Sequence, residues 1–333
     1  MNSDGSVVLL SFLLMVTLIG FILNSAIFFS MVTEWLKRPP LKPYDQIYFT
    51  MALVNLSFLC TMCVIILWQF VPVLSSTFDA SSYFYVILFF QFYYSYWLSA
   101  WLCVYYFTSI INPVQRFFAW LKRSFSEFAP KLILVSAVGS LTISLPAIWK
   151  LSPEKQNKTY ENINSSHFAP DYYIDPVYQI ISTSLGCFLP FVLSSLYPVY
   201  LLISSCLGCF IPFTLSSLCL GYTLMHILSH VCRIKFNSSG SARPNLQAHA
   251  RAARTMIWIF LLSLSLHLAQ AFQFVSSKVG GDISLLSSFL TLSFPAAQAL
   301  IIIQSSAKLR QRFQFLGHFG NVCNEKAGLH RKS

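Results

Sequence analysis

The sequence has little charge: only 10% of its 333 residues are Asp, Glu, Lys or Arg, and just 11 of them are acidic. Soluble globular domains carry about a quarter charged residues, so this deficit excludes an ordinary soluble enzyme and a disordered regulator. The net charge of +11 is basic, yet 56% of the residues are hydrophobic. A nucleic-acid binder covered in Lys and Arg is therefore also excluded. Composition alone indicates a protein whose solvent is lipid.

Charge is absent over seven long stretches, which are 8–33, 46–78, 80–115, 132–149, 176–232, 255–277 and 283–307. A helix crosses the hydrocarbon with about 20 residues, so six stretches predict one helix each and 176–232 is too long for one. We predict an all-α membrane protein, a seven-transmembrane helix bundle in one domain (1–313) with a tail (314–333). The expected helices span about 8–33, 46–72, 83–111, 130–149, 202–230, 255–277 and 284–304.

The positions of Lys and Arg predict the orientation, because short cytoplasmic loops are enriched in both. With the N-terminus outside and seven crossings, the cytoplasmic segments hold 18 of the 22 Lys and Arg residues. These segments are 34–45, 112–131, 231–254 and 305–333. We expect a multi-pass plasma-membrane protein with a cytoplasmic C-terminus and cytoplasmic tail. Two sequons, at Asn157 and Asn164, then fall in an outer loop and are expected to be glycosylated, whereas the sequon at Asn237 falls inside.

The stretch 176–232 contains a tandem duplication. Residues 176–197 (PVYQIISTSLGCFLPFVLSSLY) and 198–219 (PVYLLISSCLGCFIPFTLSSLC) are identical at 15 of 22 positions. The charge bias requires an odd number of crossings here, so one copy spans the membrane. The other copy lies in the interface, extends the helix, or dips in and returns; a gene-model artefact is the competing explanation.

Catalytic groups are missing from the spanning stretches. Apart from histidines these stretches contain no ionisable acid or base, and such groups mark proton relays and ion sites in membranes. No phosphate loop, Ser/His/Asp set or paired carboxylate is present, so we expect no enzyme and no cofactor. Cys60-x-x-Cys63 lies within an apolar run without a second pair, which favours packing over a metal site. His267 is open to two interpretations, a functional role or a hydrogen bond between packed helices.

Aromatic residues are concentrated in the run 90–101 (FQFYYSYWLSAW). Tyr94 and Trp97 share a helix face with Phe90, and Trp101 lies four residues beyond Trp97. Interfacial belts are rich in Trp and Tyr, but this run begins too deep in its helix to be belt throughout. An aromatic stripe with few polar groups suits a pocket for small, partly apolar ligands; packing is the alternative.

Several segments together resemble one family, the type 2 (bitter) taste receptors, which are G-protein-coupled receptors. The resemblance extends over about residues 15–313. Its motifs are Gly20-x-x-x-Asn24-x-x-Ile27, Trp97–Phe107 with Phe118–Arg123, Pro212-Phe213 with His230, Ala248–Met256, and Pro295 with Lys308–Gln311. Three positions depart from the family pattern: Ser109 stands in place of Lys, Gln298-Ala299 in place of His-Ser, and Ser306 in place of Asn.

The resemblance implies a receptor for small bitter-tasting agonists, bound in the outer half of the bundle, that signals to a gustducin-like heterotrimeric G protein. It makes the second copy the fifth helix and 176–197 the insertion. The implied ligand-binding residues are Trp97, Trp101 and Ser288, joined by Tyr94 from the aromatic stripe. Structural roles fall to three further residues, Asn24, Pro212 and Pro295. The implied G-protein-facing residues are Lys122, Arg123, His249, Arg251 and Arg254.

Other interpretations remain open from the sequence. The basic residues also suit topology anchoring and contact with anionic membrane lipids. A vomeronasal type 1 pheromone receptor is the nearest rival, although its expected outer-loop cysteine is missing here. A transporter or channel with eight helices, both repeat copies spanning, is a rival of a different class.

Overall fold

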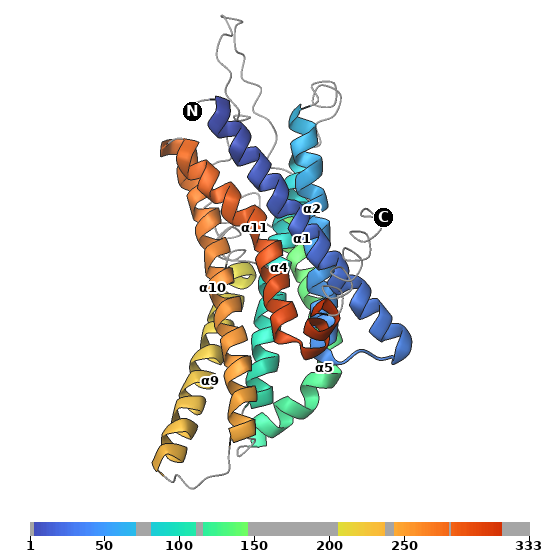
Figure 1. Ribbon diagram of the computed structural model, residues 1–333, viewed down its shortest axis with the longest axis vertical. Coiled ribbons are helices and arrows are strands. Elements are labelled where there is room, and N and C mark those ends of the chain that lie inside the picture. The colour runs from blue at the N-terminus through green and yellow to red at the C-terminus, as the bar shows by residue number, and fades with distance from the viewer. Residues whose placement is uncertain are drawn as a thin grey trace, which may run out of the picture.

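The computed structural model describes residues 3–70, 81–110, 116–145, 206–236, 243–279 and 281–314. Within these ranges every regular element is helical (Figure 1). The elements are α1 (Ser3–Lys37), α2 (Pro43–Phe70), α4 (Ser81–Ile110), α5 (Arg116–Ser144), the π-helical turn η1 (Cys206–Phe210), α9 (Ile211–Phe236), α10 (Arg243–Val279) and α11 (Gly281–Ser305). Seven of these helices are long and apolar enough to cross a membrane. This confirms the predicted seven-helix bundle.

Several expected features fall outside the described residues. They are the first repeat copy (176–197), the sequons at Asn157 and Asn164, and the tail beyond residue 314. The second repeat copy is described from Cys206 onward, where it forms η1 and the start of α9. Where a helix was expected over 202–230, the described helical segment therefore covers 206–236.

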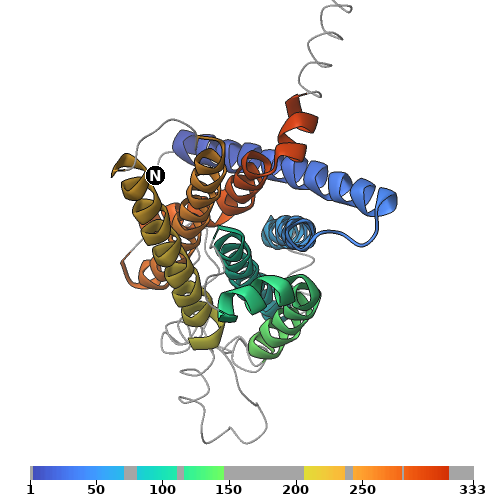
Figure 2. The same cartoon turned by 90° about the horizontal axis from the view of Figure 1, so that it is seen from below.

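The helices surround α4, as the view along the bundle shows (Figure 2). The spanning part of α4 is 61% buried, whereas that of α1 is only 17% buried. Large apolar side chains on α1 point away from the protein: Leu18, Ile22 and Phe29 are each more than 60% exposed. Such exposure carries no penalty when the neighbouring solvent is lipid hydrocarbon, which is as apolar as the side chains.

Hydroxyl groups are accommodated inside the apolar helices by local hydrogen bonds. Thr50, Ser216 and Thr223 donate to the carbonyl four residues earlier in their own helix, at 2.7–2.9 Å. Because lipid offers no partners, each polar group in a spanning helix must be satisfied within the protein. These side chains satisfy that requirement without help from a neighbouring helix.

A buried polar network joins α1, α2 and α11 near the middle of the bundle. The Asn24 side-chain amide donates to the carbonyls of Gly20 (2.8 Å) and Pro295 (3.1 Å). The Asn55 amide donates to the side-chain oxygens of Asn24 (2.9 Å) and Gln298 (2.8 Å). Gly20 packs closely here, since a Cβ built on it would be in van der Waals contact with Leu59 and Ala296.

A second junction lies closer to the charged end of the bundle. The Tyr48 hydroxyl on α2 is 2.6 Å from the Tyr106 hydroxyl on α4 and 2.7 Å from the hydroxyl of Ser305, the last residue of α11. Below it Ser306 accepts a hydrogen bond from the Leu309 amide at 3.4 Å and so caps a short helical segment, 307–314. The junction therefore fixes three helices at the point where α11 ends.

The second repeat copy packs tightly on α4 through a glycine. A Cβ built on Gly208 would lie 2.8 Å from Cδ1 of Tyr93, whose side chain is only 1% exposed. Gly221, further along α9, has open space around it within 4 Å. The first glycine is therefore required by packing and the second is not.

We expect Gly208→Ala to destabilise the protein by about 1–3 kcal/mol, the usual cost of overfilling a packed interface. Gly221→Ala in α9, which follows η1 directly, is the matched control, and it should be neutral or stabilising by at most about 1 kcal/mol, because alanine favours helix. Thermal unfolding of the detergent-solubilised protein measures both. Equal melting temperatures for the two variants would contradict the packing described here.

Candidate functional site

The aromatic stripe predicted on α4 faces α5. Trp97 and Trp101 stack with ring centroids 5.5 Å apart and planes inclined by 26°. The Trp101 indole nitrogen donates to the Ser136 hydroxyl of α5 at 2.8 Å, and the Tyr94 hydroxyl donates to the Ile133 carbonyl of the same helix at 3.3 Å. The structure thus brings three of the four predicted ligand-binding residues together. Trp97 and Trp101 keep part of their surface accessible, while Tyr94 is buried.

The fourth, Ser288, lies on α11, which packs against α10, α1 and α2. It is half-buried. Its neighbour Ser287 donates to the Ala269 carbonyl of α10 at 2.8 Å. Ser288 therefore belongs to the α10–α11 side of the bundle, whereas the hydrogen bonds of Tyr94 and Trp101 are made to α5.

An adjacent face of α4 carries a polar and aromatic group that the sequence did not single out. We name it the Tyr96 cluster; it comprises Tyr96, Phe213, His267 and Gln270. The Tyr96 hydroxyl donates to the Gln270 side-chain oxygen at 3.3 Å. The Tyr96 ring lies 4.1 Å from the His267 ring, which lies 5.5 Å from the Phe213 ring. The cluster joins α4, α9 and α10.

Two polar atoms of the Tyr96 cluster are buried without a partner among the described residues. His267 Nδ1 lies 2.7 Å from the Ser263 carbonyl, so Nδ1 is the donor and, in the neutral ring, Nε2 is an acceptor. His267 Nε2 and the Gln270 amide nitrogen have no such contact. Buried polar groups are nearly always hydrogen-bonded. An acceptor and a donor are therefore available to a small molecule or water.

The sequence contained a partial signal for the Tyr96 cluster. Tyr96 belongs to the aromatic run. For His267 the sequence left open a functional role or a hydrogen bond between packed helices. Gln270 is an uncharged polar residue in an apolar stretch. Such a residue indicates that a polar contact exists, but the sequence does not show which residue makes it. Gln91 on α4 is a similar case: its side-chain nitrogen donates to Ser57 (2.8 Å) and Thr61 (3.1 Å) of α2.

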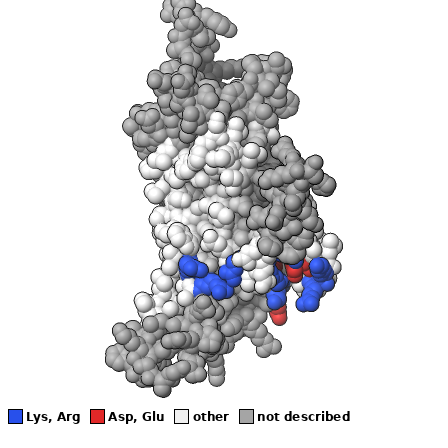
Figure 3. All heavy atoms as spheres, in the orientation of Figure 1, with Lys and Arg blue, Asp and Glu red and all other residues white. Residues whose placement is uncertain are grey.

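The opposite end of the bundle is charged. The described Lys, Arg, Asp and Glu side chains gather there (Figure 3). Of the predicted G-protein-facing residues, Arg251 is half-buried and Arg254 exposed on the first turns of α10. Lys122 and Arg123 lie within α5 and His249 within α10, but their side chains fall outside the described part of the chain.

The three predicted structural residues occupy helix contacts. Asn24 and Pro295 meet in the buried network described above. Pro212 is buried near the start of α9, where its carbonyl accepts from the Ser216 hydroxyl at 2.8 Å. Of the departures from the family pattern, Gln298 is part of the same network, and Ser109 is exposed with its hydroxyl on the Tyr105 carbonyl at 2.8 Å.

Comparison with known proteins gives a consistent result. The model of a family described as "Taste receptor protein (TAS2R)" matches residues 1–207 and 204–318 of the chain. Taste receptor type 2 member 9 of Homo sapiens is 28% identical over 294 residues, which cover 84% of this chain and 83% of that protein. Member 9 of Macaca mulatta is 27% identical over 293 residues, covering 84% of this chain and 83% of the relative. Member 40 of Gallus gallus is 23% identical over 241 residues, 69% of this chain and 68% of the relative.

Proposed function

Because this chain belongs to the type 2 taste receptor family, and is a multi-pass G-protein-coupled receptor rather than an enzyme, we propose that it detects small bitter compounds. The family match decides against the vomeronasal alternative. The proposed ligand site lies in the outer half of the bundle, where Trp97 and Trp101 supply a stacked aromatic wall. We propose that Tyr94, next to α5, and Ser288, on α11, also contact the ligand.

The observation that carries this proposal is the combination of aromatic surface on α4 with the unmatched polar atoms of α10 that lie beside Tyr96. Pockets for small ligands are mostly apolar, with a few convergent polar groups that set orientation. Trp97 offers partly accessible aromatic surface. The unmatched donor of Gln270 and the unmatched acceptor of His267 lie beside Tyr96, on the adjacent face of α4. A partly apolar agonist with one hydrogen-bonding group matches this arrangement.

Signalling follows if an agonist binds more tightly to a state whose cytoplasmic face is open, because a ligand shifts an equilibrium only by its difference in affinity. Helix α4 extends from the proposed ligand site to Tyr106, which contacts Tyr48 and so α2. A displacement of α4 would therefore change the hydrogen bonds of Tyr48 near the charged end. There we propose that Lys122, Arg123, His249, Arg251 and Arg254 contact a gustducin-like heterotrimeric G protein.

Trp97→Ala tests the ligand site. We expect the half-maximal agonist concentration to rise by at least about tenfold, since loss of an aromatic anchor costs about 2 kcal/mol or more. Calcium imaging of cells that express the receptor with a promiscuous G protein, screened with bitter compounds, gives the measurement. Trp258→Ala is the matched control, because Trp258 is 51% exposed on the outside of α10. Unchanged responses of Trp97→Ala at normal surface expression would refute the site.

We also propose the orientation given by the charge bias, with the N-terminus outside and the C-terminus cytoplasmic at the plasma membrane. Asn157→Gln and Asn164→Gln should each remove one step of the gel shift that N-glycosidase abolishes, whereas Asn237→Gln should have no effect. An antibody to a C-terminal tag should label cells only after permeabilisation. Labelling of intact cells would overturn the orientation and favour an even number of crossings.

For the duplicated region we propose that the second copy forms the fifth helix of a receptor domain (1–313), that 176–197 is an insertion, and that 314–333 is a cytoplasmic tail. Two observations support this. After Pro212 the second copy continues through α9 to Phe236 with no further proline, whereas the first is followed directly by Pro198, whose missing N–H removes one helical hydrogen bond at that point. The two family matches also overlap within the second copy.

Gly186 is the position in the first copy that corresponds to Gly208. If the second copy occupies the position against α4, Gly186→Ala should leave the melting temperature within about 1 °C of wild type, since no overpacking term arises. Gly208→Ala, measured in parallel, should lower it. The reverse pattern would show that the first copy packs against α4.

A further inference from the structure

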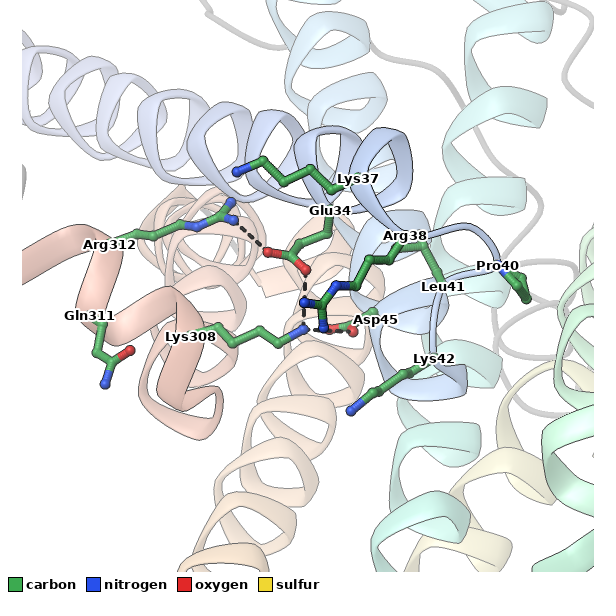
Figure 4. A pocket seen from close by; sticks show the side chains of 10 residues that line it. All are labelled: Glu34, Lys37, Arg38, Pro40, Leu41, Lys42, Asp45, Lys308, Gln311 and Arg312. Carbon is green, nitrogen blue, oxygen red and sulfur yellow. Dashed lines mark hydrogen bonds and ion pairs between the residues drawn. The ribbon is translucent and has the colours of Figure 1, made fainter.

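A groove of about 900 Å³ opens at the charged end between α1, the start of α2 and the segment 307–314 (Figure 4). Its lining contains five cationic side chains and two carboxylates. The cations are Lys37, Arg38, Lys42, Lys308 and Arg312, and the carboxylates are Glu34 and Asp45. None of the groove residues belongs to the proposed ligand site, but the assignment of this end to the cytoplasmic side rests on the orientation proposed above.

Two of the cations are already neutralised. Lys308 lies 3.4 Å from Glu34 and 3.6 Å from Asp45. Arg312 lies 2.6 Å from the other Glu34 oxygen and also donates to the Ser30 carbonyl at 2.9 Å. These ion pairs hold the segment 307–314 against α1 and α2. The carboxylates are the less exposed members, at 22% for Glu34 and 2% for Asp45.

The remaining three cations, Lys37, Arg38 and Lys42, are exposed and make no ion pair within the described residues. All three line the groove at exposed positions, Lys37 at the end of α1 and Arg38 and Lys42 in the connection to α2 (Figure 4). The rim is therefore cationic while the acids sit deeper in existing ion pairs. Such a rim attracts a ligand with more than one negative charge, because a single charge would leave two of the three cations unmatched.

The position of the groove relative to lipid identifies the source of that charge. Trp35 and Leu36, directly before Lys37, are 54% and 76% exposed. Large apolar side chains with this exposure favour contact with lipid, and cations directly after them are suited to the headgroup level. Basic pockets between helices at this level are suited to anionic lipid headgroups.

We propose that the groove binds the headgroup of a polyanionic phospholipid, one that carries phosphomonoesters on an inositol ring in addition to its phosphodiester. Lys37, Arg38 and Lys42 contact the phosphates. The Glu34–Arg312 and Asp45–Lys308 pairs form the floor and hold 307–314 in place. Bound lipid then links α1 and α2 at the end where the helix bundle meets its cytoplasmic partner.

The test uses the full chain in phosphatidylcholine nanodiscs that contain equal small amounts of phosphatidylserine and phosphatidylinositol 4,5-bisphosphate. Native mass spectrometry then measures which lipids stay bound. We expect the wild type to retain the bisphosphate at least about tenfold over phosphatidylserine. The triple variant Lys37→Gln, Arg38→Gln, Lys42→Gln should lose that preference. All three side chains are exposed, so the fold should be unaffected, which thermal unfolding checks.

Two control variants make the result specific. Lys131→Gln, Arg254→Gln, Arg310→Gln removes the same charge outside the groove and should keep the preference. Lys37→Arg, Arg38→Lys, Lys42→Arg keeps the charge in place and should also keep it. The proposal is overturned by a wild type without preference, or by equal losses in the groove variant and the charge-matched control. Displacement of the bound lipid by an equal concentration of soluble inositol 1,4,5-trisphosphate would show that free phosphate, not lipid, is the ligand.

Discussion

The structure depends on one constraint: inside lipid, a polar group has only the protein to bond with. Apolar contacts barely distinguish a neighbouring helix from a lipid tail, so polar contacts decide which helices stay together. Helix α1 illustrates this, because most of its surface faces outward. It is attached at its middle by Asn24, which bonds to α2 and α11, and at its end by Glu34, which pairs with Arg312.

The same constraint explains what could be predicted from the sequence. Stretches without charge have to be spanning helices, and this gave the seven-helix bundle without any motif. Contacts between helices were harder to predict. The spacing of Tyr94, Trp97 and Trp101 places them on one side of a helix, but periodicity does not say which neighbour they face. That neighbour is α5, through Ser136 and Ile133, and only tertiary packing could reveal it.

The Tyr96 cluster was missed for a related reason. Its members lie on three helices, and Tyr96 is more than 100 positions away in the sequence from each of the other members. None is an Asp, Glu, Lys or Arg, and each alone has an ordinary explanation as packing. Their significance comes from the two unmatched polar atoms, which become visible only when the neighbours of His267 and Gln270 are known.

Two of the departures from the family pattern make hydrogen bonds that hold helices in place. Gln298 keeps an acceptor in the central network, where it receives the Asn55 amide. Ser306 caps the segment 307–314 through the Leu309 amide, and this segment carries Lys308 and Arg312 to the acids of α1 and α2. The ion pairs at the charged end thus depend on where α11 stops. Since Ser305 of α11 also bonds Tyr48, a movement of α11 must strain the Tyr48 junction and the ion pairs together, which couples the core of the bundle to its charged end.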